Sequence, residues 1–235
     1  MKKAGMKKGK NKEFSTPYTV TNAVAKGNII TKLSLLIMGL GNIAHKQIGK
    51  GIMFLAVEAA YIWYMIQSGI YNLSMLPSLG WREQEKVWNE KKSIYEYTAG
   101  DQSSLILLYG VATIYITLMF IVVWREAVKS SYKSEVLAKS GKHLNTFKED
   151  FKSLFDQNLH KLLLAAPIMG VLIFTILPLI YNISMAFTNY SKVNDHLVLF
   201  DWVGLANFAK ILNLNDSIGK QFYSVLTWTI TWAIF

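Results

Sequence analysis

Long stretches without charge alternate with blocks of charged residues, and this pattern restricts the chain to a membrane fold. The runs from Ser104 to Trp124 and from Leu162 to Ser191 contain no Asp, Glu, Lys or Arg, and the run from Ile52 to Ile70 contains only Glu58. A helix of roughly 20 mainly apolar residues crosses the hydrocarbon core of a bilayer. The three runs therefore predict three complete transmembrane helices.

Two further apolar runs are too short to cross a bilayer by themselves. The last, from Phe222 to Phe235, resembles the start of a fourth span, so we expect the chain to be a fragment. The first, from Leu33 to Ala44, contains two glycines and is predicted to be an interfacial or re-entrant helix. The expected fold is an all-α integral membrane protein, a helical transmembrane bundle with three complete spans and a truncated fourth.

The distribution of lysine and arginine predicts the orientation. Residues 1–50 hold ten of these residues, residues 71–103 four, residues 125–161 eight and residues 189–220 three. Cytoplasmic loops of membrane proteins carry the excess of basic residues, so the N-terminus is expected in the cytoplasm. The same bias explains the net charge of +10 without a nucleic-acid partner.

No pattern in the sequence predicts enzymatic chemistry. The absence of cysteine excludes disulfides and thiolate metal sites, and the four histidines lack metal-ligand spacing. We therefore expect no catalytic residue, cofactor or metal. The charge inside a predicted span, Glu58, is a candidate functional residue. The alternative is that Glu58 lies near the cytoplasmic boundary and pairs with Lys50.

The blocks of charge divide the chain into four segments. Residues 1–50 are expected to be a cytoplasmic Lys-rich leader with an interfacial helix, and residues 51–124 an accessory transmembrane hairpin. Residues 125–161 form a cytoplasmic linker, and residues 162–235 begin the transmembrane core. In the linker, apolar residues from Leu144 to Leu159 keep helical spacing among lysines. This predicts an amphipathic helix that lies on the membrane surface or docks a cytoplasmic partner.

The third span and the segment after it carry an ordered series of residues. The series comprises Pro178, Phe187, Thr188, Trp202, Gly204, Asn207 and Phe208. It resembles the entry segment of the binding-protein-dependent sugar permeases, in which a late proline precedes two short motifs and the next span. The two spans before it resemble the accessory spans of the maltose and maltodextrin class of that family.

The resemblance implies a permease subunit of an ABC importer for maltose- or maltodextrin-type oligosaccharides in the bacterial cytoplasmic membrane. The implied partners are a second permease subunit, cytoplasmic ATPase subunits, an extracellular sugar-binding protein and the lipid bilayer. A separate subunit would hydrolyse ATP, so this chain is not expected to be an enzyme. The alternative is a small membrane-anchored assembly or regulatory protein without a transport path.

Overall fold

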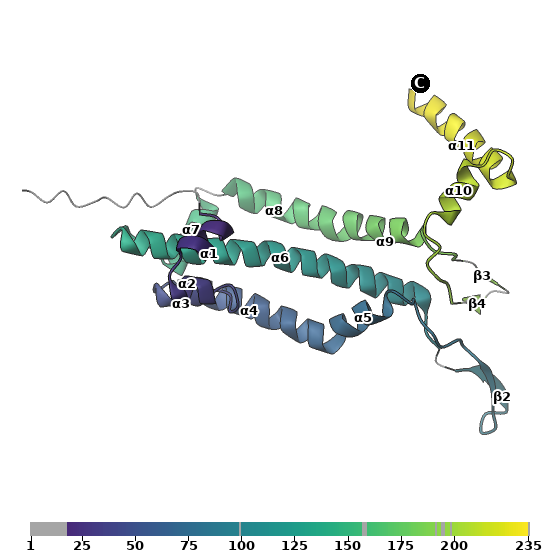
Figure 1. Cartoon of the computed structure of the whole chain (residues 1–235), viewed down its shortest axis with the longest axis horizontal. Helices are drawn as coiled ribbons and strands as arrows, with labels where there is room; N and C mark the ends of the chain where they lie inside the picture. Colours follow the sequence, from purple (N-terminus) through teal and green to yellow (C-terminus); the bar gives the residue numbers. More distant parts are fainter. Residues whose placement is uncertain are drawn as a thin grey trace, which may run out of the picture. The chain divides into compact units, whose positions relative to one another are not determined.

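The computed structural model describes residues 18–98, 100–156, 159–190, 192–193, 196–197 and 199–234 (Figure 1). Residues 1–17 of the Lys-rich leader, and Phe235 at the end of the expected fourth span, lie outside these ranges. Most described residues are helical. The helical segments are α1 (Val20–Lys26), α2 (Ile29–Leu33), α3 (Leu40–Ala44), α4 (Ile48–Tyr64), η1 (Met65–Gly69), α5 (Ile70–Met75), α6 (Ser103–Lys139), α7 (Phe147–Phe155), α8 (Leu159–Val171), η2 (Leu172–Ile176), α9 (Leu177–Met185), α10 (Ala206–Leu212) and α11 (Ser217–Ile234).

Two antiparallel hairpins complete the described structure. Strands β1 (Lys86–Asn89) and β2 (Ile94–Tyr97) pair with Val87 opposite Glu96. Strands β3 (Lys192–Val193) and β4 (His196–Leu197) form a shorter pair. The sequence interpretation did not include either hairpin.

Three helices of the described chain are long and apolar enough to cross a membrane, namely Ile48–Met75, Ser103–Lys139 and Leu163–Met185. Each coincides with one of the predicted spans, so the expected all-α membrane class is confirmed. The first combines α4, the π-helical segment η1 and α5. Helix α11, which contains the start of the expected fourth span, is not one of these three.

The second helix extends well beyond its apolar stretch. Helix α6 continues past Trp124 and ends only at Lys139, although charge begins at Arg125. Charged Arg, Glu and Lys are good helix formers, and they therefore carry the helix out of its apolar part without a break. The linker expected from residue 125 thus begins as helix.

The third helix accommodates a proline inside its apolar run. Pro178 lies in the first turn of α9, directly after the π-helical segment η2. Proline lacks a backbone N–H and its ring crowds the carbonyl four residues earlier, and a π-helical turn changes the local hydrogen-bond register. The helix ends at Met185, six residues before the uncharged run ends at Ser191.

The backbone contacts divide the chain into two compact units. The first contains α1–α3, α4 to Ile62, α6 from Met119 onward, and α7. Its core consists of Ala23 on α1 and three residues of α6, Val128, Tyr132 and Val136. Figure 1 shows α1 beside this part of α6. The short N-terminal helices therefore pack on protein, through the extension of α6 that follows the apolar stretch.

The segment from Leu33 to Ala44, which the sequence predicted to be one interfacial or re-entrant helix, is divided in the structure. Helix α2 ends at Leu33, and α3 begins only after Gly39, whose φ of +80° is left-handed. A Cβ at Gly39 would lie 2.3–2.9 Å from backbone atoms of Gly51 on α4. Glycine at position 39 therefore allows both the turn and the close approach of the two backbones, and it splits the predicted helix.

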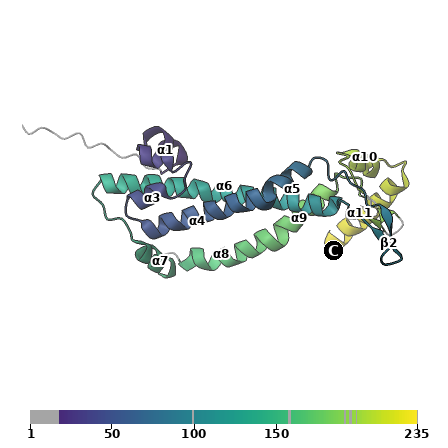
Figure 2. The same cartoon turned by 90° about the horizontal axis from the view of Figure 1, so that it is seen from below.

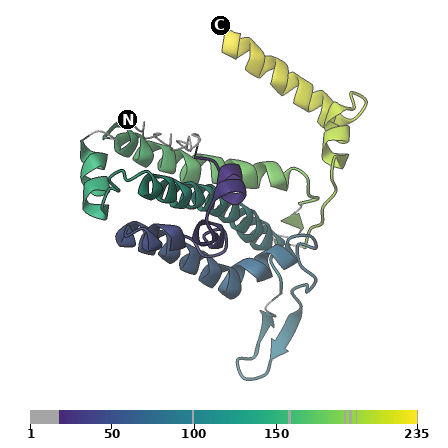
Figure 3. The same ribbon diagram turned by 60° about the vertical axis from the view of Figure 1, so that its left-hand side comes forward.

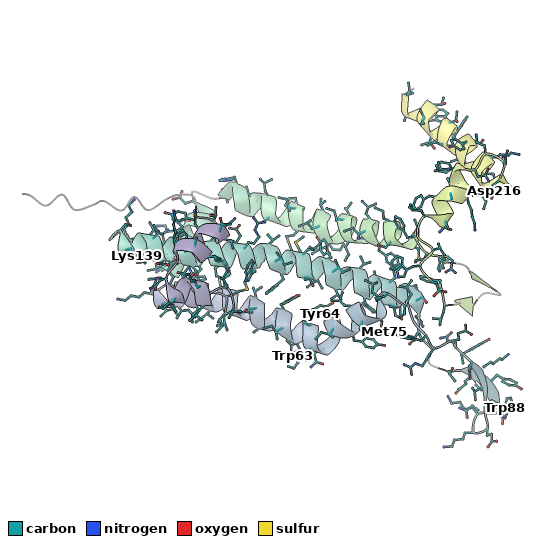
Figure 4. All side chains as sticks on the ribbon, viewed as in Figure 1. Trp63, Tyr64, Met75, Trp88, Lys139 and Asp216 are labelled. Atoms are coloured by element: carbon teal, nitrogen blue, oxygen red, sulfur yellow. The ribbon has the colours of Figure 1, made fainter. Side chains whose placement is uncertain are left out.

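The second unit contains the remainder of the described chain. Its core joins the end of the first span, α6, α9 and the segment after β4, through the buried residues Leu79, Leu107, Val111 and Phe200 and the partly buried Leu177, Tyr181 and Met185. The β1–β2 hairpin follows α5, whose last residue is Met75, and it carries the exposed Trp88 (Figure 4).

Candidate functional site

The chain segments on either side of the short β3–β4 hairpin are joined directly after the third span. Thr188 and Trp202 form an antiparallel bridge. On one side of it, the N–H of Val203 donates to the carbonyl oxygen of Phe187 at 2.8 Å. On the other side, the N–H of Asn189 donates to the carbonyl oxygen of Asp201 at 3.0 Å. The two segments of the resemblance motif are therefore neighbours in space.

One side chain fastens this junction. The amide Nδ2 of Asn207 donates to the carbonyl oxygens of Ala186 at 3.0 Å and Thr188 at 2.7 Å. These carbonyls lie where the third span ends, and terminal helix carbonyls need partners outside the helix. The rings of Phe187 and Phe208 lie with centroids 5.2 Å apart beside this contact. Asn207 thus supplies the donors that the helix end lacks.

Gly204 has a backbone requirement that explains its place in the motif. Its φ is +57°, and a Cβ added there would meet no atom within 4 Å. A left-handed φ of this kind is readily adopted by glycine. The turn at Gly204 leads into α10, which carries Asn207 and Phe208. We call Phe187, Thr188, Trp202, Gly204, Asn207 and Phe208 the motif cluster.

The motif cluster is also tied to the two earlier spans of its unit. The indole N–H of Trp202 donates to the carbonyl oxygen of Leu76, just after α5, at 2.9 Å. The N–H of Phe200 donates to Oγ of Ser103, the first residue of α6, at 3.1 Å. The Phe200 side chain is buried in the core of the unit. The cluster is therefore a structural junction between helix ends.

The seventh motif residue, Pro178, lies apart from the cluster within the third span. Its position after η2 gives it a role in the shape of that helix. The six residues of the motif cluster, by contrast, come together directly after the third span. Their geometry supports a structural role, and nothing in it points to contact with a ligand.

Glu58 has a partner other than the expected lysine. Its Oε2 accepts a hydrogen bond from the backbone N–H of Met38 at 2.8 Å. The ammonium group of Lys50 lies instead 3.4 Å from the carboxylate of Asp150. Pairing of Glu58 with Lys50 is therefore wrong, and a functional role for this intramembrane charge stays a prediction. In the structure, Glu58 holds the turn between α2 and α3 against α4.

A buried carboxylate on α6 was missed by the sequence interpretation. Glu135 is only 1% exposed, and its oxygens accept from the N–H of Asn28 at 2.9 and 3.1 Å and from Oγ1 of Thr31 at 2.6 Å. Lys139 also forms an ion pair with it. Glu135 lies three and seven residues after Tyr132 and Val128 of the core, so its helical spacing was the available signal. This spacing can be recognised only if α6 is taken to continue past its apolar stretch.

A second buried polar group joins α3 to α6. The amide Nδ2 of Asn42, which carries two hydrogens, lies within hydrogen-bond distance of three acceptors: Oε1 of Gln47 at 2.8 Å, Oγ of Ser130 at 2.9 Å and Oγ of Ser134 at 3.2 Å. Asn42 is completely buried. These contacts of Nδ2 fix where the N-terminal helices sit on α6, while the buried Oδ1 of Asn42 has no hydrogen-bond partner among the described residues.

The base of the β1–β2 hairpin is closed by one carboxylate. The side chain of Asp101 is 9% exposed and accepts from the backbone N–H groups of Trp81 at 2.9 Å and Arg82 at 3.1 Å. These hydrogen bonds hold the pKa of Asp101 below its ordinary value because they favour the charged form.

Within the described ranges, no group of three or more His, Asp or Glu side chains is placed to hold a metal ion. The polar contacts of the motif cluster, of Glu135 and of Asn42 each end on backbone or side-chain partners in the same unit. These contacts position helices.

Comparison with known proteins supports the resemblance. The chain is 28% identical over 221 residues to the "Maltodextrin transport system permease protein MdxF" of Bacillus subtilis, which covers 92% of this chain and 46% of that protein. It is 29% identical over 203 residues to the "Maltodextrin transport system permease protein MalC" of Streptococcus pneumoniae, covering 85% and 42%. The "Galactooligosaccharides transport system permease protein GanP" of Bacillus subtilis is 25% identical over 212 residues, covering 87% and 46%.

The chain spans about half the length of these curated relatives. No family model matches it, and no solved structure matches it. The likeness to sugar-transport permeases that the motif predicted is confirmed. Together with the three apolar helices, it identifies the chain as a multi-pass membrane protein.

Proposed function

We propose that this chain is a permease subunit of an ABC importer that carries maltodextrin-type oligosaccharides across the bacterial cytoplasmic membrane. The supporting observation is the likeness to a maltodextrin permease protein over 92% of the chain. The motif cluster also supports it, because six of the seven motif residues on which the resemblance rested form one junction. The chain itself is not an enzyme, and ATP is hydrolysed by a separate ATPase subunit.

The third helix supports a place on the transport path. No residue of its most apolar 18-residue stretch is fully buried. Leu177, Tyr181 and Met185 pack on the core of the second unit, and the remaining surface of the helix is free to contact lipid or another permease subunit. Its π-helical segment η2 and Pro178 interrupt the regular hydrogen bonding, and such interruptions bend helices. A second permease subunit would complete the path, and an extracellular sugar-binding protein would deliver the substrate.

The proposed topology places the N-terminus and the segment around α7 in the cytoplasm. The β1–β2 hairpin and the motif cluster then lie outside, where a binding protein would dock. The absence of cysteine makes this testable with single cysteines at Lys91 and Lys142. A membrane-impermeant maleimide should label Lys91→Cys in intact cells and Lys142→Cys only after permeabilisation. The reverse pattern would overturn the orientation.

The names of the relatives suggest two substrate classes for this chain, maltodextrins and galactooligosaccharides. Two of those named above are maltodextrin permease proteins, and the third is named for galactooligosaccharides at the lowest identity of the three, 25%. Maltodextrin is therefore the preferred substrate class.

An uptake measurement tests the proposed function. We would delete the gene in its source organism and follow radiolabelled maltotetraose and a labelled galactooligosaccharide. Maltotetraose uptake should fall to background and return when the gene is restored, while uptake of the second sugar stays unchanged. Unchanged uptake of both sugars would overturn the proposal, and selective loss of galactooligosaccharide uptake would overturn its substrate class.

A further inference from the structure

Helix α7 carries a ridge of aromatic side chains that are about half exposed. Phe147, Phe151 and Phe155 recur every four residues and are 45%, 54% and 55% exposed. Neighbouring rings are in contact, with centroids 6.4 Å and 5.2 Å apart. Because an aromatic side chain buries a large apolar area when it is covered, a continuous exposed ridge of three indicates a surface that meets an apolar environment.

The charges of α7 are arranged around this ridge. At 3.6 residues per turn, Lys148 and Lys152 fall along one edge of the phenylalanine face, while Glu149 falls on the opposite face. Among the described residues neither lysine has an ion-pair partner. The acidic side chains are already engaged: Glu149 accepts from the N–H of Thr146 at 2.8 Å, and Asp150 pairs with Lys50. The unpaired charge beside the ridge is therefore positive.

Contacts hold α7 beside the first residues of α4, where the first membrane-crossing helix begins. Besides the pair formed by Asp150, the amide Nε2 of Gln47 donates to the carbonyl oxygen of Asn145 at 3.0 Å. A Cβ at Gly49 would lie 2.8 Å from the Phe147 side chain, so the two helices touch there. Figures 2 and 3 show α7 at the beginning of α4, running across that helix.

The chain that follows α7 leads almost at once into another apolar helix. Only three residues separate Phe155 from the start of α8 at Leu159, and the third membrane-crossing helix is counted from Leu163. Helix α7 is therefore held, through contacts and through chain connection, between the points where two apolar helices begin. A helix in that position lies at the boundary between water and hydrocarbon.

We infer that α7 is a membrane-surface helix that inserts its phenylalanine ridge into the cytoplasmic leaflet and attracts acidic lipid headgroups through Lys148 and Lys152. Interfacial helices combine an aromatic or aliphatic face with flanking lysines in this way, and basic residues next to the membrane are attracted to anionic lipid. The inference needs the chain to cross a bilayer, but it does not depend on the transport of a sugar.

Single spin labels test this insertion. The cysteine-free chain, reconstituted in vesicles of phosphatidylcholine and phosphatidylglycerol, would be labelled at Phe151→Cys on the ridge. Ser153→Cys, on the opposite face of the same helix, is the matched control. Collision with oxygen should exceed collision with a water-soluble nickel complex several-fold at position 151, and the ratio should reverse at position 153. Equal access of the nickel complex to both positions would overturn the inference.

A charge reversal tests the headgroup contribution. In the Phe151→Cys background, the double change Lys148→Glu and Lys152→Glu should reduce the depth of the label in vesicles with phosphatidylglycerol. It should have little effect in phosphatidylcholine alone, and Lys92→Glu on the hairpin should have little effect in either. Equal effects in the two lipids would overturn the proposed attraction to acidic headgroups.

A protein partner is the competing occupant of the ridge. The same Phe151→Cys label would be measured before and after ATPase subunits are added to the reconstituted chain. If the ridge inserts into lipid, the label reaches its depth in the membrane in the chain alone, and this depth does not change when ATPase subunits are added. A label that is exposed to the nickel complex until the ATPase binds would show a docking surface for protein, and the inference would be wrong.

Discussion

Replacement of Asn207 by alanine tests whether the motif cluster is held as the structure indicates. The change removes two hydrogen bonds, 2.7 Å and 3.0 Å long, to the carbonyl oxygens of Thr188 and Ala186. Water compensates part of the loss, because the side chain is only half-buried. Since a typical intramolecular hydrogen bond contributes about 0.5–1.5 kcal/mol net, we expect the junction to lose about 1–2 kcal/mol of stability.

Hydrogen exchange measures this loss of stability at the junction itself. The N–H groups of Val203 and Asn189 cross the junction to Phe187 and Asp201, and their exchange reports its opening. A loss of about 1–2 kcal/mol corresponds to about 5- to 30-fold faster exchange, measured on the chain in nanodiscs. The matched control is Asn215→Ala, an exposed amide in the following turn, which should leave both rates unchanged.

The outcome separates two interpretations of the motif. Asn207→Asp should loosen the junction at least as much as alanine, because an ionised carboxylate has no N–H to donate and repels the two carbonyl oxygens. If neither change accelerates exchange at Val203 and Asn189, the hydrogen bonds of Asn207 do not hold the junction. The structural explanation of the motif would then be refuted.

Three other predictions concern Gly39, Glu135 and Asp101, the first two with a control substitution, and each is measured by unfolding in mixed micelles or by NMR. Gly39→Ala combines a left-handed φ with backbone overlap, so it should lower the free energy of unfolding by about 2–5 kcal/mol. Its control, Gly141→Ala, has a φ of +66° in open space and should lower the free energy of unfolding by about 1–2 kcal/mol. Glu135→Ala should lower the free energy of unfolding by about 3 kcal/mol because it leaves buried donors unpaired. Its control, Glu126→Ala, removes an exposed ion pair and should lower the free energy of unfolding by less than about 1 kcal/mol. The lowered pKa of Asp101 means that its contribution is present above the unfolded pKa of about 3.9 and is lost as pH falls through the folded value. The two amides that it binds should shift only in that acidic range, and Asp101→Asn should remove the transition.

The positions of the spans could be predicted from the sequence because uncharged runs have a single stable solution in lipid. Every backbone polar group must be satisfied within the membrane, which makes a long apolar run helical. The ends were harder to predict. Helix α6 continues to Lys139 because residues after Trp124 form helix as readily in water as the preceding ones do in lipid. The third helix stops at Met185 because the chain turns back into the Thr188–Trp202 bridge.

The side-chain partners could not be predicted because they depend on long-range contacts. The sequence suggested Lys50 for Glu58 from helical spacing, but Lys50 is drawn to Asp150, which is 100 residues away. The split at Gly39 follows from the close approach of Gly51, which no local pattern reveals. Glu135 lay in a stretch interpreted as linker, so its burial against α2 was not expected.

The β1–β2 hairpin was missed for a different reason. Its residues are part of a charged loop in which the apolar stretches are short, with Val87 and Trp88 adjacent on one strand and Ile94 and Tyr95 adjacent on the other. Such short apolar pairs do not show the period of two that predicts a strand. Edge-to-face packing of Trp88 on Tyr95 at 4.9 Å supports the pairing within the structure. The motif cluster, by contrast, was found because a resemblance had already grouped its residues.

The most direct test of the central proposal is to isolate the chain from its own membranes with an affinity tag. Mild detergent extracts would be purified in the presence of a non-hydrolysable ATP analogue, and co-purifying proteins would be identified by mass spectrometry. A permease subunit of an importer should be recovered with an ATP-binding subunit and a second multi-pass permease protein in fixed proportion. Recovery with an unrelated complex, or without either of these partners, would contradict the proposal and favour the assembly or regulatory alternative.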